Sequence, residues 1–497
     1  MRIVLDLGTS WAWTRPPVGI VRTERKFAQH LLESSDIPVA FCRFDKTLGC
    51  HVAIDAARAR ELVGAVTATV AEDAKDEILA GVVAMPSEAG RATSAVLVTP
   101  ALHETPAASK PASASLRARS AAAGKRLGHA FVRRMPETLR PEALDTLRAG
   151  KKFAKGTAQL AASWFKIART RRAVAVIGES LETRVSHSPS KAFLFEPTDV
   201  YLSMGLDWEY NNLVDLHRER RRLGFKTVLF CYDTIPVQFP HLYSFDARQM
   251  FARYFVDLAH TADRVVAISE TSRRDLLSLM DEVGGPTPPV EVILLGTDLQ
   301  VAEASVRAPS ADLEKKPFVL CVSTIEARKN HEVLYNAWDR LVAKHGDEFP
   351  QLVIVGMMGW GVSDLVFRMR TNPRLKNRIR ILDNLADAEL AWLYRHSLFS
   401  VFPSLYEGWG LPVVESLALG KPCICSTAPA VTEAAQGLAT ELDPLDTPGW
   451  VEAIERLWRD TEIREKTAER CTREFHPQTW QDHAEQLLRV AQEAVRS

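Results

Sequence analysis

Residues 403–426 read Pro-Ser-Leu-Tyr-Glu-Gly-Trp-Gly-Leu-Pro-Val-Val-Glu-Ser-Leu-Ala-Leu-Gly-Lys-Pro-Cys-Ile-Cys-Ser and are the most informative part of the sequence. The apolar residues that end at Phe402 predict a buried strand. A glycine-rich turn follows, and Pro412 suits the first position of a helix. The apolar run 423–426 predicts a second strand, so the stretch alternates strand, turn, helix and strand.

Two glutamates flank the start of this predicted helix. Glu407 lies on the turn, and Glu415 lies three residues after Pro412, roughly 4.5 Å along the axis. The free N–H groups and the dipole of a helix N-terminus favour an anion. Carboxylates that accept sugar hydroxyls, beside amides that hold a phosphate, indicate a nucleotide-sugar site. The alternative is an ordinary strand-turn-helix unit with solvated glutamates, which requires neither two glycines around Trp409 nor an acid so near the helix start.

Two glutamates separated by seven residues, within Glu-Gly-x-Gly-Leu-Pro, resemble the signature of the retaining family 4 glycosyltransferases. The resemblance covers about 200–475 well and the first 35 residues partly, and it does not inform residues 36–199. It implies the α/β fold called GT-B, in which two Rossmann-like domains face a central cleft.

The composition sets the outer limits. A chain of 497 residues has room for two or three domains, and 62 Lys and Arg against 62 Asp and Glu indicate no partner. Seven cysteines without a C-x-x-C pair predict a reduced, metal-free cytoplasmic protein. Because Asp6 interrupts the first apolar run and no uncharged stretch reaches ~18 residues, we expect neither a signal peptide nor a membrane span.

Alternating strands and helices in the C-terminal half predict a doubly wound parallel sheet, with function at the carboxyl ends of its strands. The predicted strands there are 318–322, 352–356, 379–382 and 398–402, and the predicted helices are 332–344, 361–370 and 387–395. In the N-terminal half, strands are predicted at 2–5, 226–230 and 264–268, and a helix at 23–33.

Three parts of the chain follow from these patterns and from the resemblance. We predict an N-terminal, acceptor-side Rossmann-like domain at 1–305 and a C-terminal, nucleotide-sugar-binding Rossmann-like domain at 306–475. A C-terminal helix at 476–497 is expected to pack back on the N-terminal domain, as the resemblance implies.

A basic helical insertion is predicted in the N-terminal domain at about 103–175. Residues 109–172 contain 16 Lys and Arg against three acidic residues. A helix from Glu142 would align four apolar residues in one stripe, with lysines on other faces. The four are Phe153, Leu160, Trp164 and Ile167. Such a helix at 142–172 suits an anionic membrane surface, but an internal hairpin packed on the domain fits the same periodicity, and both readings stay open. The pattern does not favour nucleic acid.

An Arg-Lys pair follows the strand at 318–322. Arg328 and Lys329 are placed to neutralise a diphosphate, because arginine offers a fork of donors and lysine a compact charge. The stretch resembles the Glu-x-Arg-Lys-Asn of family members near mannosyl and rhamnosyl transferases of surface polysaccharide synthesis. A surface basic pair at a helix start is the alternative, and the helix dipole opposes it.

On the N-terminal side, residues 15–22 are predicted to form a loop between the first strand and the first helix. The resemblance implies that Gly19 and Arg22 approach the donor phosphates, and a simple turn with Arg22 in solvent is the alternative. Tyr232-Asp233 resembles a His-Asp pair of the family. Asp233 could orient the acceptor hydroxyl or take its proton, or it could only cap a helix, and Tyr232 puts in doubt the acid–base role of the usual histidine.

The predicted site has two sets of residues and no metal. The predicted catalytic residues are Glu407, Arg328, Lys329 and Asp233. The predicted donor-binding residues are Glu415, Gly408, Trp409, Gly410, Leu411, Gly19, Arg22, Ser323, Asn384 and Leu385. For Asn384 and Leu385, a plain loop is an equal alternative.

The resemblance implies metal-independent, retaining transfer of a hexose, with mannose or rhamnose favoured, from a nucleotide-diphosphate sugar in cell-surface polysaccharide synthesis. The expected acceptor is a glycan or a polyprenyl-linked glycan, no cofactor is expected, and the expected location is cytoplasmic or peripheral at the inner face of the cytoplasmic membrane. The sequence lacks Asp-x-Asp, which disfavours a metal-dependent transferase with a single nucleotide domain. It also lacks a P-loop, H-E-x-x-H and G-x-S-x-G, which disfavours a P-loop nucleotidase, a zinc protease and a serine hydrolase. A GT-B phosphorylase or epimerase, and a non-catalytic scaffold that binds nucleotide sugar or glycan, are the alternatives.

Overall fold

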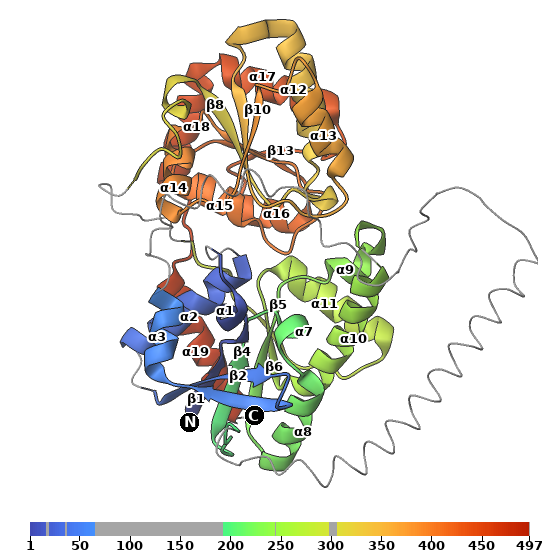
Figure 1. The fold of residues 1–497 in the computed structure, drawn as a ribbon, viewed down its shortest axis with the longest axis vertical. Coiled ribbons are helices and arrows are strands. Elements are labelled where there is room, and N and C mark those ends of the chain that lie inside the picture. The colour runs from blue at the N-terminus through green and yellow to red at the C-terminus, as the bar shows by residue number, and fades with distance from the viewer. Residues whose placement is uncertain (16–18, 35–36, 65–191, 244, 298–305, 497) are drawn as a thin grey trace, which may run out of the picture. The chain divides into compact units, whose positions relative to one another are not determined.

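Two mainly parallel β-sheets carry the fold of the computed structural model (Figure 1). The structure describes residues 1–497 except 16–18, 35–36, 65–191, 244, 298–305 and 497, and the elements below belong to one unit formed by Met1–Thr69 and Ser190–Ser497. The predicted basic insertion at about 103–175, with its apolar stripe, lies outside the described residues.

The N-terminal sheet has seven strands in the order β3-β2-β1-β4-β5-β6-β7. Their bounds are β1 Arg2–Asp6, β2 Val39–Asp45, β3 Cys50–Ile54, β4 Asp199–Ser203, β5 Lys226–Cys231, β6 Arg264–Ala267 and β7 Val290–Val292. All neighbours run parallel except β2 and β3, which pair antiparallel with Phe41 opposite Ile54. The sequence predicted β1, β5 and β6, and the structure confirms them and adds the other four strands.

Helices on this sheet are bounded by residues that suit their ends. They are α1 Gly8–Ala12, α2 Gly19–Ser34, α3 Ala56–Gly64, α7 Asp207–Tyr210, α8 Leu213–Leu223, α9 Ile235–Gln238, η3 Pro240–Leu242, α10 Phe245–Thr261 and α11 Glu270–Val283. The Ser269 side chain accepts a hydrogen bond from the backbone N–H of Ser272 and so caps α11. Gly284 ends the same helix in the left-handed conformation, where glycine carries no steric penalty.

The C-terminal sheet is entirely parallel, in the order β10-β9-β8-β11-β12-β13. Its strands are β8 Phe318–Val322, β9 Gln351–Val355, β10 Ile379–Leu382, β11 Ser400–Phe402, β12 Cys423–Ser426 and β13 Thr440–Leu442. Its helices are η5 Leu313–Lys315, η6 Ala327–Lys329, α12 His331–His345, η7 Gly346–Glu348, α13 Ser363–Thr371, α14 Asp387–His396, α15 Leu411–Ala418, α16 Pro429–Ala435, α17 Thr447–Arg459 and α18 Thr461–Glu474. The predicted alternation is confirmed, and the two-domain α/β architecture is that of the expected GT-B fold.

The last helix, α19 Trp480–Arg496, returns to the N-terminal sheet. It contacts α2, β4 and β5, and Figure 1 shows it in red among the blue and green N-terminal elements. Leu487 of α19 is fully buried in a core that also contains Ile3 of β1 and Val413 of α15. Burial of such side chains contributes roughly 1.5–3 kcal/mol each, so the chain end is part of the N-terminal core.

Among the described helices, none has the length and hydropathy needed to cross a bilayer.

Candidate functional site

A cavity of about 470 Å³, here called the main cavity, is lined by residues that follow strands of both sheets. Asp233 follows β5, Ser323 follows β8, Asn384 follows β10 and Glu407 follows β11. The carboxyl ends of parallel strands meet at one edge of each sheet, which explains why residues distant in sequence share this wall. All 14 residues predicted as catalytic or donor-binding line the main cavity, while their roles stay predictions.

Glu407 holds both cations of the Arg-Lys pair. Arg328 donates from Nη1 to Oε2 of Glu407 at 2.6 Å, and Lys329 donates from Nζ to Oε1 at 2.5 Å. Ser404 donates its hydroxyl to the same carboxylate. Burial raises the pKa of Glu407, but the charges of Arg328 and Lys329 outweigh burial and lower it to about 2. Glu407 is therefore ionised at neutral pH and orients the two cations.

Glu326 is a further acid at this cluster, and the sequence analysis did not predict a role for it. Arg328 donates from Nη2 to Oε1 of Glu326 at 2.9 Å, and Glu326 is only 3% exposed. The sequence could have indicated this role, because Glu326 lies only two residues before Arg328. The Arg-Lys pair thus faces two carboxylates, and neither cation stands unpaired in the main cavity.

The loop that carries the cations is fastened to the loop that carries Glu407. Residues 327–329 form the short helix η6, and Asn330 follows in the left-handed conformation with φ 54°. The Asn330 amide donates to the carbonyl oxygen of Pro403 at 3.2 Å, and the N–H of Leu405 donates to the carbonyl of Arg328 at 2.9 Å. These bonds fix the ion-pair geometry through the backbone.

Glu415 is buried in α15 and has two donors. Arg22 donates from Nη1 to Oε1 at 3.2 Å, and the Tyr394 hydroxyl donates to Oε2 at 2.9 Å. Arg22 also donates from Nη2 to Asp387 at 2.6 Å. Burial raises the pKa of Glu415, and the charge of Arg22 opposes that rise. Asp387 and Tyr394 were not predicted, and no sequence pattern marks them.

The predicted loop at residues 15–22 is wrong for its last four residues. Helix α2 begins at Gly19, four residues before the predicted start, so Arg22 lies in its first turn. Gly19 has a φ of +48°, a conformation that glycine adopts without strain. Arg22 is 7% exposed, which rules out the alternative in which it lies in solvent.

The turn 408–410 contacts the N-terminal part of the chain closely. The hydroxyls of Ser269 and Ser272 donate to the carbonyl oxygen of Gly408 at 2.6 and 3.0 Å. A Cβ on Gly408 would lie 2.1 Å from the carbonyl oxygen of Tyr232, so only glycine fits there. Gly410 caps α15, whose first residue is Leu411, so Pro412 occupies the second position and not the predicted first one.

Asp233 lines the main cavity and also accepts a hydrogen bond from the backbone N–H of Ile235 at 3.0 Å, at the start of α9. Burial raises its pKa, while the charge of Arg328 lowers it. Tyr232 donates its hydroxyl to the carbonyl oxygen of Met204 at 2.6 Å, so the phenol is engaged inside the N-terminal part.

Three other predicted residues complete the wall. Ser323 lies 3.1 Å from Nε2 of His331, whose pKa burial lowers to about 4, so this imidazole is neutral. Asn384 is exposed, with φ 53°, and Leu385 follows it. Among the described residues, no group of three or more His, Cys, Asp or Glu could hold a metal ion.

The comparison with protein families gives the class of the C-terminal part. The family model described as "Glycosyl transferases group 1" matches residues 304–473. Residues 304–473 therefore form a group 1 glycosyltransferase domain, which spans β8 to β13 and contains both glutamates and the Arg-Lys pair.

The chain is also similar to three curated mannosyltransferases. WbdA, a serotype-specific mannosyltransferase of Escherichia coli, is 28% identical over 308 residues, which are 60% of this chain and 37% of WbdA. The O-antigen chain mannosyltransferase B of Escherichia coli is 28% identical over 171 residues, 34% of this chain and 44% of that protein. RfbU, an O-antigen chain mannosyltransferase of Salmonella typhimurium, is 27% identical over 147 residues, 29% of this chain and 39% of RfbU. The chain spans less than half the length of these relatives.

Solved structures are similar at a lower level. Anabaena Alr3699/HepE in complex with UDP has 18% identity and a TM-score of 0.46, over 59% of this chain and 79% of that one. The apo structure of OtsA has 14% identity and a TM-score of 0.48, over 60% of this chain and 73% of that one. The architecture above therefore rests on its own strands and helices.

Proposed function

We propose that this protein is a retaining, metal-independent glycosyltransferase that moves a hexose from a nucleotide-diphosphate sugar to a glycan or lipid-linked acceptor in surface polysaccharide synthesis. The convergence of Glu407, Arg328, Lys329 and Glu415 on one cavity carries the proposal. Mannose is favoured because WbdA, mannosyltransferase B and RfbU are all described as mannosyltransferases.

The donor would bind with its nucleoside toward Glu415 and its sugar toward Glu407. A carboxylate has about four lone-pair positions, and Arg22 and Tyr394 occupy two at Glu415. The remaining positions can accept the ribose hydroxyls. Asn384 and Leu385, on the same wall, would lie against the base.

The departing diphosphate would be stabilised by Arg328 and Lys329 while Glu407 keeps both in place. Nε of Arg328 is buried and has no partner among the described residues, and lysine has three protons to donate. Both cations can therefore donate to phosphate oxygens without leaving Glu407. Preorganised charge of this kind lowers a barrier because it needs no rearrangement as the leaving group develops charge.

The chemical step would be a front-side displacement. The bond between the anomeric carbon and the diphosphate oxygen breaks, the diphosphate leaves with the electron pair, and the acceptor oxygen bonds to the same face. The proton of the acceptor hydroxyl passes to the departing diphosphate, and Asp233 would orient that hydroxyl. Arg328 and Lys329 supply the positive charge that a metal ion supplies in other transferases.

The test is nucleotide release from UDP-, GDP- and dTDP-sugars, with and without a panel of glycan and lipid-linked acceptors. We expect nucleotide release that depends on the acceptor and continues in the presence of EDTA. NMR of the product should show that the anomeric configuration of the donor is retained. Release that requires inorganic phosphate would indicate a phosphorylase. Isomerisation of the sugar without an acceptor would indicate an epimerase, and binding without turnover would indicate a scaffold.

Peripheral attachment to the inner face of the cytoplasmic membrane is proposed through residues 142–172. Deletion of this segment should abolish sedimentation with anionic liposomes and spare hydrolysis of the donor. Liposome binding by the truncated protein would refute the membrane role.

A further inference from the structure

A second cavity, of about 450 Å³, adjoins the main cavity and is here called the basic cavity. Arg22, Arg25, Lys26 and Arg60 line it, against Glu33 and Asp387. Arg22 and Asp387 belong to the walls of both cavities, so the basic cavity and the main cavity share part of one wall.

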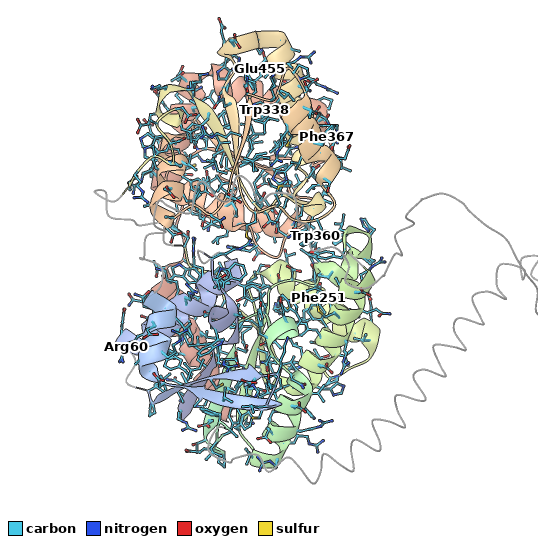
Figure 2. All side chains as sticks on the ribbon, viewed as in Figure 1. Arg60, Phe251, Trp338, Trp360, Phe367 and Glu455 are labelled. Atoms are coloured by element: carbon cyan, nitrogen blue, oxygen red, sulfur yellow. The ribbon has the colours of Figure 1, made fainter. Side chains whose placement is uncertain are left out.

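The cations come from one face of α2 and from α3, two helices that contact each other. Residues 22, 25, 26, 29 and 33 follow the spacing of a single helix face, and Arg60 belongs to α3, as Figure 2 shows. Three cations therefore occupy the first two turns of α2, and its first turn has no acidic residue. Cations at a helix N-terminus oppose the helix dipole, so this charge gives α2 no stability of its own.

Arg25 is the second observation that points to a ligand. It is 6% exposed, and its Nε has no partner among the described residues. Its Nη2 donates a long hydrogen bond of 3.5 Å to the carbonyl oxygen of Trp13. Its neighbour Arg22 instead has two carboxylate partners, Asp387 and Glu415.

Glu24 is the acid nearest in charge effect to Arg25, but it does little to neutralise the positive charge of Arg25. Glu24 is fully buried, and burial raises its pKa to about 8, so it is largely protonated at neutral pH. A buried cation without a paired anion is costly, and an anionic ligand in the basic cavity would remove that cost.

We propose that the basic cavity binds a phosphate or diphosphate group carried by the acceptor, an inference that rests on the proposed glycosyl transfer. Arginine donors match phosphate oxygens in geometry and charge, and Arg60 and Lys26 would close on the group from the two helices. Arg22 connects this site to Glu415, so the anionic group of the acceptor would sit beside the donor.

The test uses the full chain with its main cavity saturated by GDP or UDP, whichever binds more tightly, and measures the affinity of inorganic pyrophosphate by calorimetry. Arg60→Glu should raise the Kd by about tenfold or more, since it replaces an attraction with a repulsion. The matched control is Arg58→Glu, which makes the same charge change on the same helix at an exposed residue paired with Glu61. That control should change the Kd by less than about twofold, because Arg58 does not line the basic cavity and its charge is screened from a ligand there.

An unchanged Kd in Arg60→Glu, or equal changes in both variants, would overturn the site. Arg25→Met serves as a second variant because it removes the buried charge and keeps most of the side-chain volume. It should also raise the Kd, and a lowered melting temperature with an unchanged Kd would show that Arg25 is only structural. Pyrophosphate binding needs no turnover, so failure of this test and failure of sugar transfer are separate results.

The source of the phosphate is decided by two further probes. Tighter binding of geranyl diphosphate than of glucose 1-phosphate supports a lipid-linked acceptor, and the reverse order supports a soluble sugar phosphate. If neither probe loses affinity in Arg60→Glu, the proposal fails.

Discussion

Arg22, in the first turn of α2, donates a hydrogen bond at 3.2 Å to Glu415 in α15, 393 positions later in the chain. The same guanidinium pairs with Asp387 at the start of α14. One side chain of the N-terminal part thus orients the carboxylate proposed to bind the donor ribose.

Arg22→Ala should raise the KM for the donor more than it lowers kcat, because Glu415 loses a donor that positions it. We expect about a tenfold rise, consistent with one lost bond between charged groups. A double-mutant cycle of Arg22→Ala and Asp387→Ala measures the coupling energy between these two residues. Since Arg22 links both acids, the double variant should lose less than the sum of the two single variants, and strict additivity would contradict the linkage.

Glu407→Gln should reduce nucleotide release by about 100-fold or more, since the two cations lose the charge that orients them. Glu455→Gln is the control. Glu455 of α17, labelled in Figure 2, pairs with Lys344 and His345 of α12. It does not line the main cavity, so its loss should leave the rate within about twofold.

The Glu407→Gln variant also tests how the free energy of unfolding depends on pH in the acid range. The pKa of Glu407 is lowered to about 2 in the folded protein from an ordinary value of 4.5. Its ionisation therefore stabilises the fold above pH 4.5, and this contribution is lost as the pH falls toward about 2. Urea unfolding at pH 3 and pH 6 should show a smaller pH difference for Glu407→Gln than for the native chain. Equal differences would show that Glu407 is not strongly paired.

Glu24→Gln should alter stability in the opposite pH direction. The Glu24 carboxyl is fully buried, and its pKa rises to about 8 from 4.5, so the folded chain holds a proton that the unfolded chain loses above pH 4.5. Native stability should therefore fall as the pH rises from about 5 to 8, and glutamine, which cannot ionise, should remove part of that fall. We expect the variant to gain roughly 4 kcal/mol relative to the native chain between pH 5 and 9, at about 1.4 kcal/mol per pH unit over the interval between the two pKa values.

Urea titrations at those two pH values check this expectation. Glu33→Gln, at an exposed position of the same helix, should leave the pH profile parallel to that of the native chain. A parallel profile for Glu24→Gln as well would contradict the burial argument.

Gly408→Ala should abolish activity, since its Cβ would lie 2.1 Å from the carbonyl oxygen of Tyr232. The turn must then move, and it takes Glu407 away from Arg328 and Lys329. Gly285→Ala is the control because nothing lies within 4 Å of its Cβ and its φ is not positive. Initial rates and melting temperatures of both variants test this expectation. A fully active Gly408→Ala variant would show that the turn does not pack against Tyr232.

The apolar runs predicted β8, β9, β11 and β12 because nearly all residues of these strands are buried, as in parallel strands covered on both faces. Strand β13 was not predicted, since two of its three residues are exposed and it has no apolar run. The antiparallel pair β2 and β3 was not predicted, since its burial alternates less clearly and it sits at the edge of the sheet. The start of α2 was placed too late because Gly19 resembles a loop residue in sequence, whereas its positive φ begins the helix.

The local sequence sets which functional groups the site contains. Residue types at a fixed spacing place Glu407 before a helix, Glu415 within it and Arg328 beside Lys329, since a turn and a helix are local structures. The partners of those groups follow from the tertiary fold and could not be predicted. Glu407 holds both cations, and Tyr394 and Arg22 converge on Glu415. These contacts form where strands of the two sheets end close to one another. No local sequence pattern encodes the distance between residues so far apart in the chain.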